Sequence, residues 1–98
     1  MLYVSLCKVD AIDEKILQDL KKNVALELGQ QLKKISRRKR ISQSDLAFLV
    51  GMDRQYLYKI ETAKVTPNIG TIAGLAFALN VSLSELFQDI SFERYKNS

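Results

Sequence analysis

Histidine is missing from this sequence of 98 residues, and cysteine occurs only once, at Cys7. These two residue types supply many catalytic bases, nucleophiles and metal ligands. No glycine-rich phosphate loop or spaced cluster of metal ligands takes their place. The carboxylates are scattered and are mostly explained as helix caps or helix charges. The sequence therefore predicts a protein that is not an enzyme and that has no metal site or cofactor.

Disulfides, membrane spans and repeats are also missing. A single cysteine cannot form a disulfide within the chain, and this favours a reducing cytoplasm. The apolar start MLYVSLCKV lacks the basic flank and cleavage site of a signal peptide, and no segment is apolar for long enough to span a membrane. With one proline, no low-complexity stretch and 47% hydrophobic residues, the chain is expected to form one compact domain.

Positive charge is concentrated in the middle of the chain. Residues 33–64 hold nine cations and three anions, a net charge of +6, although the whole chain carries only +4. The other residues hold six cations and eight anions. A basic run such as KKISRRKR is often merely a solvated surface. Beside a DNA-reading motif, however, it is typical of a surface that binds nucleic acid.

Residues 41–64, ISQSDLAFLVGMDRQYLYKIETAK, predict two short helices joined by a turn. Ala47 allows the helices to cross closely, and Gly51 tolerates the positive φ that such a turn needs. Apolar residues recur at helical spacing on the inner side of both helices: Leu46, Ala47, Val50, Leu57 and Ile60. Long donor-bearing side chains, suited to base edges and phosphates, remain on the outer side of the second helix: Arg54, Gln55, Tyr58 and Lys59.

This segment resembles the Cro/repressor-type helix-turn-helix family, also called XRE-like. LGQQLKKI (28–35) is similar to the family's first helix, and TPNIGTIAGLAFALNVSLSELF (66–87) is similar to its fourth and fifth helices. The resemblance implies an all-α fold with five helices. A shorter stretch, DRQYLYKIE (53–61), also resembles the recognition helix of restriction-modification controller proteins.

Three parts of the chain are predicted: an N-terminal extension (1–22), a helix-turn-helix domain (23–89) and a C-terminal tail (90–98). Residues 2–9 alternate in polarity and predict a short strand, after which Asp10 is expected to cap a helix. That helix either runs into the basic segment or breaks near Asn23 or Gly29. Its apolar residues recur every four positions: Ile12, Ile16, Leu20, Val24, Leu28 and Leu32.

The later helices are predicted from their caps and apolar spacing. The expected N-terminal caps are Ser42 or Ser44, then Asp53, Asn68, and Ser82 or Ser84. The residues expected to face the core in the last two helices are Ile72, Leu75, Ala76, Leu79, Leu83, Leu86 and Phe87. The tail from Ile90 to Tyr95 is a strand or a loose end.

The expected base contacts come from Arg54, Gln55, Tyr58 and Lys59. Arginine can bind O6 and N7 of guanine, and glutamine offers a donor–acceptor pair to adenine. Tyr58 can instead cover the domain's own surface, and Tyr56 is expected to be partly buried.

The resemblance implies that Gln43 contacts a DNA phosphate at the start of its helix. The other expected backbone contacts are Arg37, Arg38, Lys39, Arg40, Lys64, Thr66 and Asn68. At least one of the four cations at 37–40 must face solvent instead.

The sequence departs from the family pattern at three positions. Glu61 matches a glutamate whose usual arginine partner is replaced here by Ser36. We expect Glu61 to pair with Arg37 or Arg40, or to be exposed, because burying an unpaired carboxylate is costly. Arg40 and Ala63 replace glycines, and a left-handed conformation there costs about 1 kcal/mol. We therefore expect both turns to differ from those of the family.

The predicted function is a sequence-specific, dimeric DNA-binding transcriptional regulator in the cytoplasm. It acts as a repressor or controller of its own or a neighbouring promoter, and it binds double-stranded DNA at a two-fold operator without a small-molecule ligand. Two alternatives remain open: an antitoxin that joins DNA binding to toxin capture, and a helical adaptor that binds only protein.

The apolar residues of the N-terminal extension must be buried somewhere. They pack either against the chain's own fourth or fifth helix or, as we favour, between the subunits of the dimer. The last helix and the tail are other possible dimer elements.

Overall fold

The computed structural model describes residues 13–88, 90 and 92. This part of the chain contains five helices and no strand. The helices are α2 (Glu14–Arg38), α3 (Gln43–Val50), α4 (Arg54–Glu61), α5 (Ile69–Leu79) and α6 (Leu83–Leu86). The predicted all-α class is thereby confirmed. The strand predicted at residues 2–9 and most of the tail lie outside the described residues.

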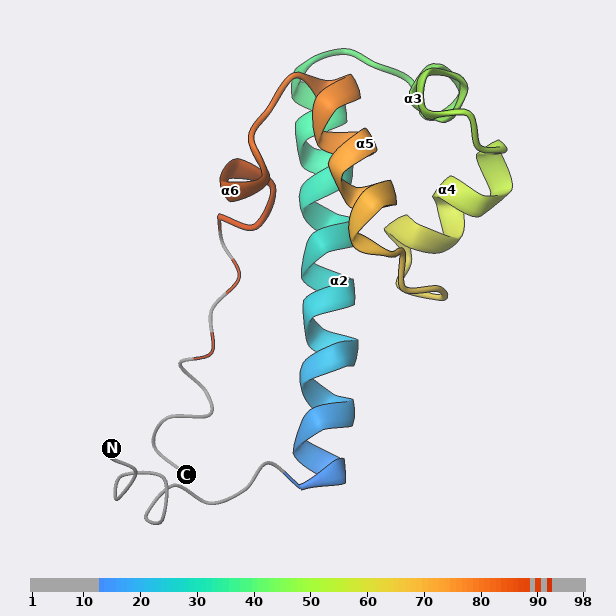
Figure 1. Cartoon of the computed structure of the whole chain (residues 1–98). Coiled ribbons are helices and arrows are strands. Elements are labelled where there is room, and N and C mark those ends of the chain that lie inside the picture. The colour runs from blue at the N-terminus through green and yellow to red at the C-terminus, as the bar shows by residue number, and fades with distance from the viewer. Residues whose placement is uncertain (1–12, 89, 91, 93–98) are drawn as a thin grey trace.

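Helix α2 is continuous over 25 residues, so neither Asn23 nor Gly29 breaks it. Its N-cap is Asp13, whose carboxylate accepts a hydrogen bond from the backbone N–H of Ile16 at 2.8 Å. The cap predicted at Asp10 lies outside the described residues. The first half of α2 projects beyond the other helices, which pack around its second half (Figure 1).

The core forms where the second half of α2 meets the four shorter helices. The inner stripes predicted for α3, α4 and α5 are confirmed, apart from Val50, which is only half-buried. Leu83 is 41% exposed, so its predicted place in the core is wrong. A helix of four residues has one turn, and that turn buries Leu86 instead. The core cluster consists of Leu28, Leu32, Ile35, Leu46, Ala47, Leu57, Ile60, Ile72, Leu75, Ala76, Leu79 and Leu86.

Each of the later helices begins at a side chain that accepts a backbone N–H bond three residues on. Asp53 and Asn68 cap α4 and α5 as predicted, at 2.8 Å. Of Ser42 and Ser44, Ser42 caps α3, and its Oγ accepts the N–H of Asp45 at 3.0 Å. Of Ser82 and Ser84, Ser82 caps α6, and its Oγ accepts the N–H of Glu85 at 3.0 Å. These bonds satisfy donors that have no partner inside a helix, and so they fix where each helix starts.

Arg40 and Ala63 both adopt the left-handed conformation, with φ of 60° and 61°. Both residues thus adopt the conformation whose steric cost led us to expect turns different from those of the family. In it, the N–H of Ile41 reaches the carbonyl of Ser36 at 2.9 Å, and the N–H of Lys64 reaches that of Lys59 at 2.8 Å. Such bonds satisfy the last carbonyl groups of a helix. They offset the strain of placing a residue other than glycine in the left-handed conformation.

We expect Ala63→Gly to stabilise the protein. Glycine accepts a positive φ without a steric penalty, so the free energy of unfolding should rise by about 1 kcal/mol. Urea unfolding measures this change. The control is Gln30→Gly at an exposed position inside α2, which should lower the free energy of unfolding by about 1 kcal/mol. If both variants are destabilised alike, residue 63 is not left-handed in solution.

Candidate nucleic-acid interface

Helices α3 and α4 are joined by a tight turn at Gly51. Its φ is 74°, in the left-handed region, as predicted for this position. The N–H of the following residue, Met52, donates to the carbonyl of Ala47 at 3.0 Å and closes the end of α3. Ala47 itself is 3% exposed, and its small side chain allows α3 to pack closely against its neighbours. The two helices therefore form a compact, locally closed pair.

Helix α4 is buried on one side and polar on the other. Leu57 and Ile60 are almost fully buried and hold its inner side against the core. The four predicted base-contact residues are all exposed: Arg54, Gln55, Tyr58 and Lys59. These polar side chains are therefore the part of α4 that is accessible to a binding partner.

The two tyrosines of α4 are both partly exposed. Tyr58 is 49% exposed, and Lys64 Nζ lies 5.7 Å from the centre of its ring, in cation–π range. Tyr58 thus leaves about half of its surface open instead of covering the domain. Tyr56, predicted to be partly buried, is 36% exposed.

The carboxylate of Glu61 is buried, with 7% of the residue exposed, and its partner is Gln43. Nε2 of Gln43 donates to Oε1 of Glu61 at 2.7 Å. Both expectations for Glu61, pairing with Arg37 or Arg40 and exposure, were therefore wrong. The start of α3 lies beside the end of α4, which brings the amide within reach, whereas both arginines stay exposed. One amide hydrogen of Gln43 is used in this bond, and the amide carries a second hydrogen that can be donated to another acceptor.

Gly29 has a packing role that the sequence pattern did not predict. A Cβ atom added there would lie 2.4 Å from the carbonyl oxygen of Glu61 and 2.9 Å from that of Ile60. The last turn of α4 thus rests directly on the backbone of α2. A glycine inside a helical pattern is the signal for such close packing, but it predicted only a possible break.

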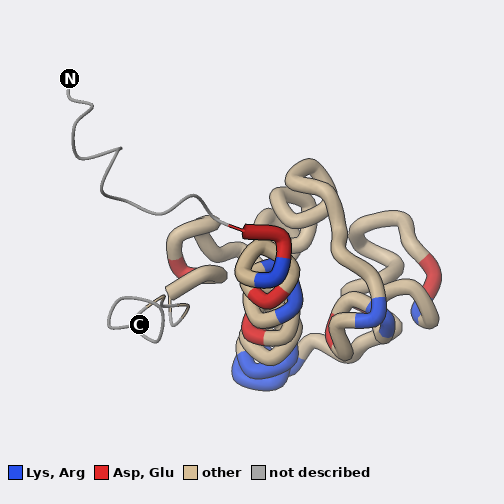
Figure 2. Tube along the Cα trace, turned by 90° about the horizontal axis from the view of Figure 1, so that it is seen from below, with Lys and Arg blue, Asp and Glu red and all other residues tan. Residues whose placement is uncertain are grey.

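The basic end of α2 lies next to this helix pair. Arg37, Arg38, Lys39 and Arg40 are all exposed. Nη2 of Arg38 pairs with Oε2 of Glu85 in α6 at 2.9 Å, so part of its charge is compensated within the protein. Figure 2 shows the blue residues of α2 and of the neighbouring helices gathered on the lower side of the view.

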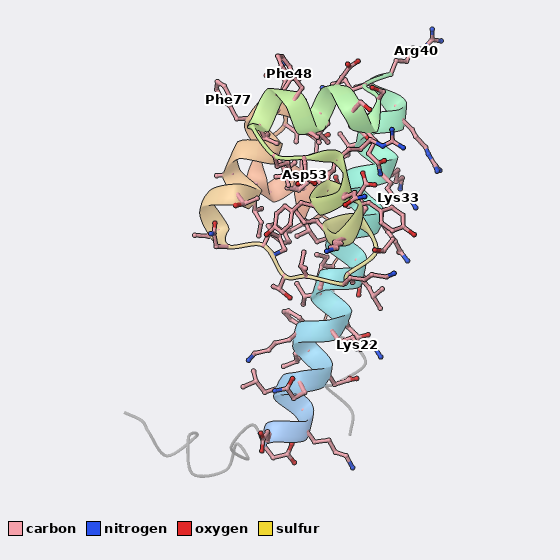
Figure 3. All side chains as sticks on the ribbon, turned by 90° about the vertical axis from the view of Figure 1, so that its right-hand side faces the viewer. Lys22, Lys33, Arg40, Phe48, Asp53 and Phe77 are labelled. Atoms are coloured by element: carbon pink, nitrogen blue, oxygen red, sulfur yellow. The ribbon has the colours of Figure 1, made fainter. Side chains whose placement is uncertain are left out.

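The remaining predicted backbone contacts follow α4. Lys64, Thr66 and Asn68 are exposed, in the loop between α4 and α5. Oδ1 of Asn68 accepts the N–H of Thr71, which leaves its amide nitrogen as the group that can donate to a phosphate. In Figure 3, Asp53 at the start of α4 faces the viewer, and Lys33 and Arg40 lie toward the right-hand edge. The predicted contact residues thus extend from α2 across α4 to the start of α5.

Within residues 13–88, no helix is long and apolar enough to cross a membrane. The same part of the chain holds no group of three or more side chains placed to bind a metal ion.

Comparison with known proteins matches this chain to a helix-turn-helix family, to a control protein and to a repressor. The HTH_3 helix-turn-helix family model matches residues 32–86. The control protein C.MunI of Mycoplasma sp is 32% identical over 72 residues, covering 72% of this chain and 97% of that protein. The immunity repressor protein of Bacillus phage phi105 is 30% identical over 61 residues, covering 62% of this chain and 42% of that protein.

Among solved structures, the restriction-modification controller protein C.AhdI from Aeromonas hydrophila superimposes with a TM-score of 0.62 at 36% identity. The match covers 71% of this chain and 98% of C.AhdI. The residues that the family model matches, 32–86, contain α3 to α6 and the last part of α2.

Proposed function

This chain belongs to the helix-turn-helix family of DNA-binding transcriptional regulators, and we propose on this premise that it acts as a homodimer on a two-fold operator. Its relatives are control proteins and repressors, not enzymes. The controllers C.MunI and C.AhdI are matched along 97% and 98% of their length, but the phage repressor along only 42%. A controller of its own or a neighbouring promoter is therefore the function that we favour.

One observation carries the proposal: the exposed polar side of α4 and the exposed cations at the end of α2 belong to two helices that pack against each other. We assign the base contacts to Arg54, Gln55, Tyr58 and Lys59. We assign the phosphate contacts, which position the helix but carry no sequence information, to Gln43, Arg37, Arg38, Lys39, Arg40, Lys64, Thr66 and Asn68.

The proposed two-fold symmetry follows from the size of the reading element. A helix of eight residues can contact only a few base pairs, which is too little to define one site in a genome. Two copies double the site that is read, and their half-sites should be centred about 34 Å apart along the DNA.

Selection of bound sequences from random duplex DNA tests this function. We expect an inverted repeat, a footprint over both half-sites and two chains per duplex. One chain bound at saturation to a single asymmetric half-site would rule out the two-fold operator. Absence of any preferred sequence would rule out specific promoter control.

Arg54→Ala is expected to weaken binding to the selected site and to relax its sequence preference. Loss of a bidentate contact to guanine costs about 1–3 kcal/mol and affects one base pair. Titration against the site and its single-base variants measures both effects. The control is Lys15→Ala on the projecting half of α2, which should preserve the preference at every base pair. If Arg54→Ala changes neither affinity nor preference, another residue faces the bases.

A further inference from the structure

Helix α5 is apolar on its outer side as well as its inner side. It contains no charged residue, and its inner residues lie in the core. On the outer side, Ile69 is 67% exposed and Phe77 is 88% exposed, with Ala73 exposed between them. These three residues are spaced four apart and therefore lie along one face of the helix. A helix that is apolar all round is normally buried on all sides, so this face is expected to have a partner.

Helix α3 extends the same surface. Phe48 is 83% exposed, and α3 packs against α5. Figure 3 shows Phe48 and Phe77 projecting from the same upper edge of the domain. We call these four residues the Phe48–Phe77 face: Phe48, Ile69, Ala73 and Phe77. Apolar residues scattered singly over a surface are normal. Two strongly exposed phenylalanines on one edge instead indicate an interaction site.

We propose that the Phe48–Phe77 face is the surface through which two copies of this chain associate about a two-fold axis. The inference rests on the proposed function, because a two-fold operator requires two chains, and it names the surface that joins them. In a two-fold interface the same patch faces itself, so a charge close to the axis meets its own sign. All four residues of this face are uncharged, and two copies can meet there without like-charge repulsion.

The other exposed apolar stripe fits this role less well. Ile16 and Leu17, each 41% exposed, lie on the projecting half of α2. Charged residues surround them on that helix: Glu14, Lys15, Asp19, Lys21 and Lys22. Both side chains are also less exposed than either phenylalanine, so less apolar surface there is available to a partner.

The position of the face also suits a shared operator. In Figure 3, Asp53 at the start of α4 faces the viewer, whereas Phe48 and Phe77 project at the upper edge, away from Arg40. The two phenylalanines therefore lie at the edge of the view that shows the start of α4 from the front. In the proposed dimer, a two-fold axis along this edge turns both α4 helices toward the same DNA.

Charge substitution at Phe77 tests the surface. Phe77→Glu and Phe77→Lys each place like charges across the axis, and each should raise the dimer dissociation constant at least about tenfold. An equimolar mixture of the two variants should restore the dimer, because the heterodimer pairs opposite charges. Sedimentation velocity without DNA measures association, and circular dichroism verifies the fold. If a Phe77 variant fails to fold, the Phe48→Glu and Phe48→Lys pair replaces it.

The matched control is the pair Leu17→Glu and Leu17→Lys on α2, which should leave association unchanged. If the Phe77 variants dimerise like the wild type, the Phe48–Phe77 face is not the dimer interface. The proposed two-fold operator would not be affected by that result. Two monomeric variants whose mixture stays monomeric would place residue 77 in the interface but away from the axis. A wild-type chain that binds one half-site alone would refute the proposed function, and the face with it.

Discussion

Replacing Gly29 with alanine is expected to displace the recognition helix α4 and to lower the free energy of unfolding by about 3 kcal/mol. The new Cβ would lie 2.4 Å from the carbonyl oxygen of Glu61 and 2.9 Å from that of Ile60. These are backbone atoms, so no side-chain rotation relieves the overlap, and α4 as a whole must move. Because α4 carries the proposed base contacts, DNA affinity should fall together with stability.

Urea unfolding and a DNA titration measure the two effects of Gly29→Ala. The matched control is Gly74→Ala in α5, where the added Cβ would meet only Val50 Cγ1, at 3.9 Å. Alanine favours a helix by about 1 kcal/mol over glycine, so the control should be as stable as the wild type or more so. If Gly29→Ala behaves like this control, α2 and α4 are further apart in solution than in this structure.

The affinity for DNA is expected to fall steeply as salt is raised. Each neutralised phosphate contributes about −0.9 to the slope of log affinity against log salt concentration, so about six contacts give a slope of about −5. Raising salt from about 50 to 200 mM should then weaken binding by about a thousandfold. Fluorescence anisotropy at several salt concentrations measures the slope. A slope near zero would contradict the proposed role of the cations at the end of α2.

Two single substitutions refine this expectation. Lys39→Ala should weaken binding equally on all sequences and make the slope less steep by about 1. Arg38→Ala should act in the same direction but less strongly, because its guanidinium pairs with Glu85 at 2.9 Å in the free protein. Lys15→Ala, far along the projecting half of α2, serves as the control that leaves the slope unchanged.

The sequence by itself determined the features that depend on near neighbours in the chain. The caps at Asp53 and Asn68, the turn at Gly51 and the buried stripes of α3, α4 and α5 all follow from local patterns. A cap bonds to an N–H three residues away, and a helical stripe repeats every three to four residues. These patterns are therefore visible in a single sequence. They also predicted the exposed polar side of α4.

Only the tertiary structure decided the features that depend on contacts between distant segments. Gln43 reaches Glu61 because α3 and α4 meet, and Gly29 matters because α4 rests on α2. Arg40 and Ala63 accept positive φ because the chain must turn there and bond its own helix ends. The sequence leaves Phe77 outside the core-facing stripe of α5. Only the packing decides that nothing in the described part of the chain covers this side chain, which is 88% exposed.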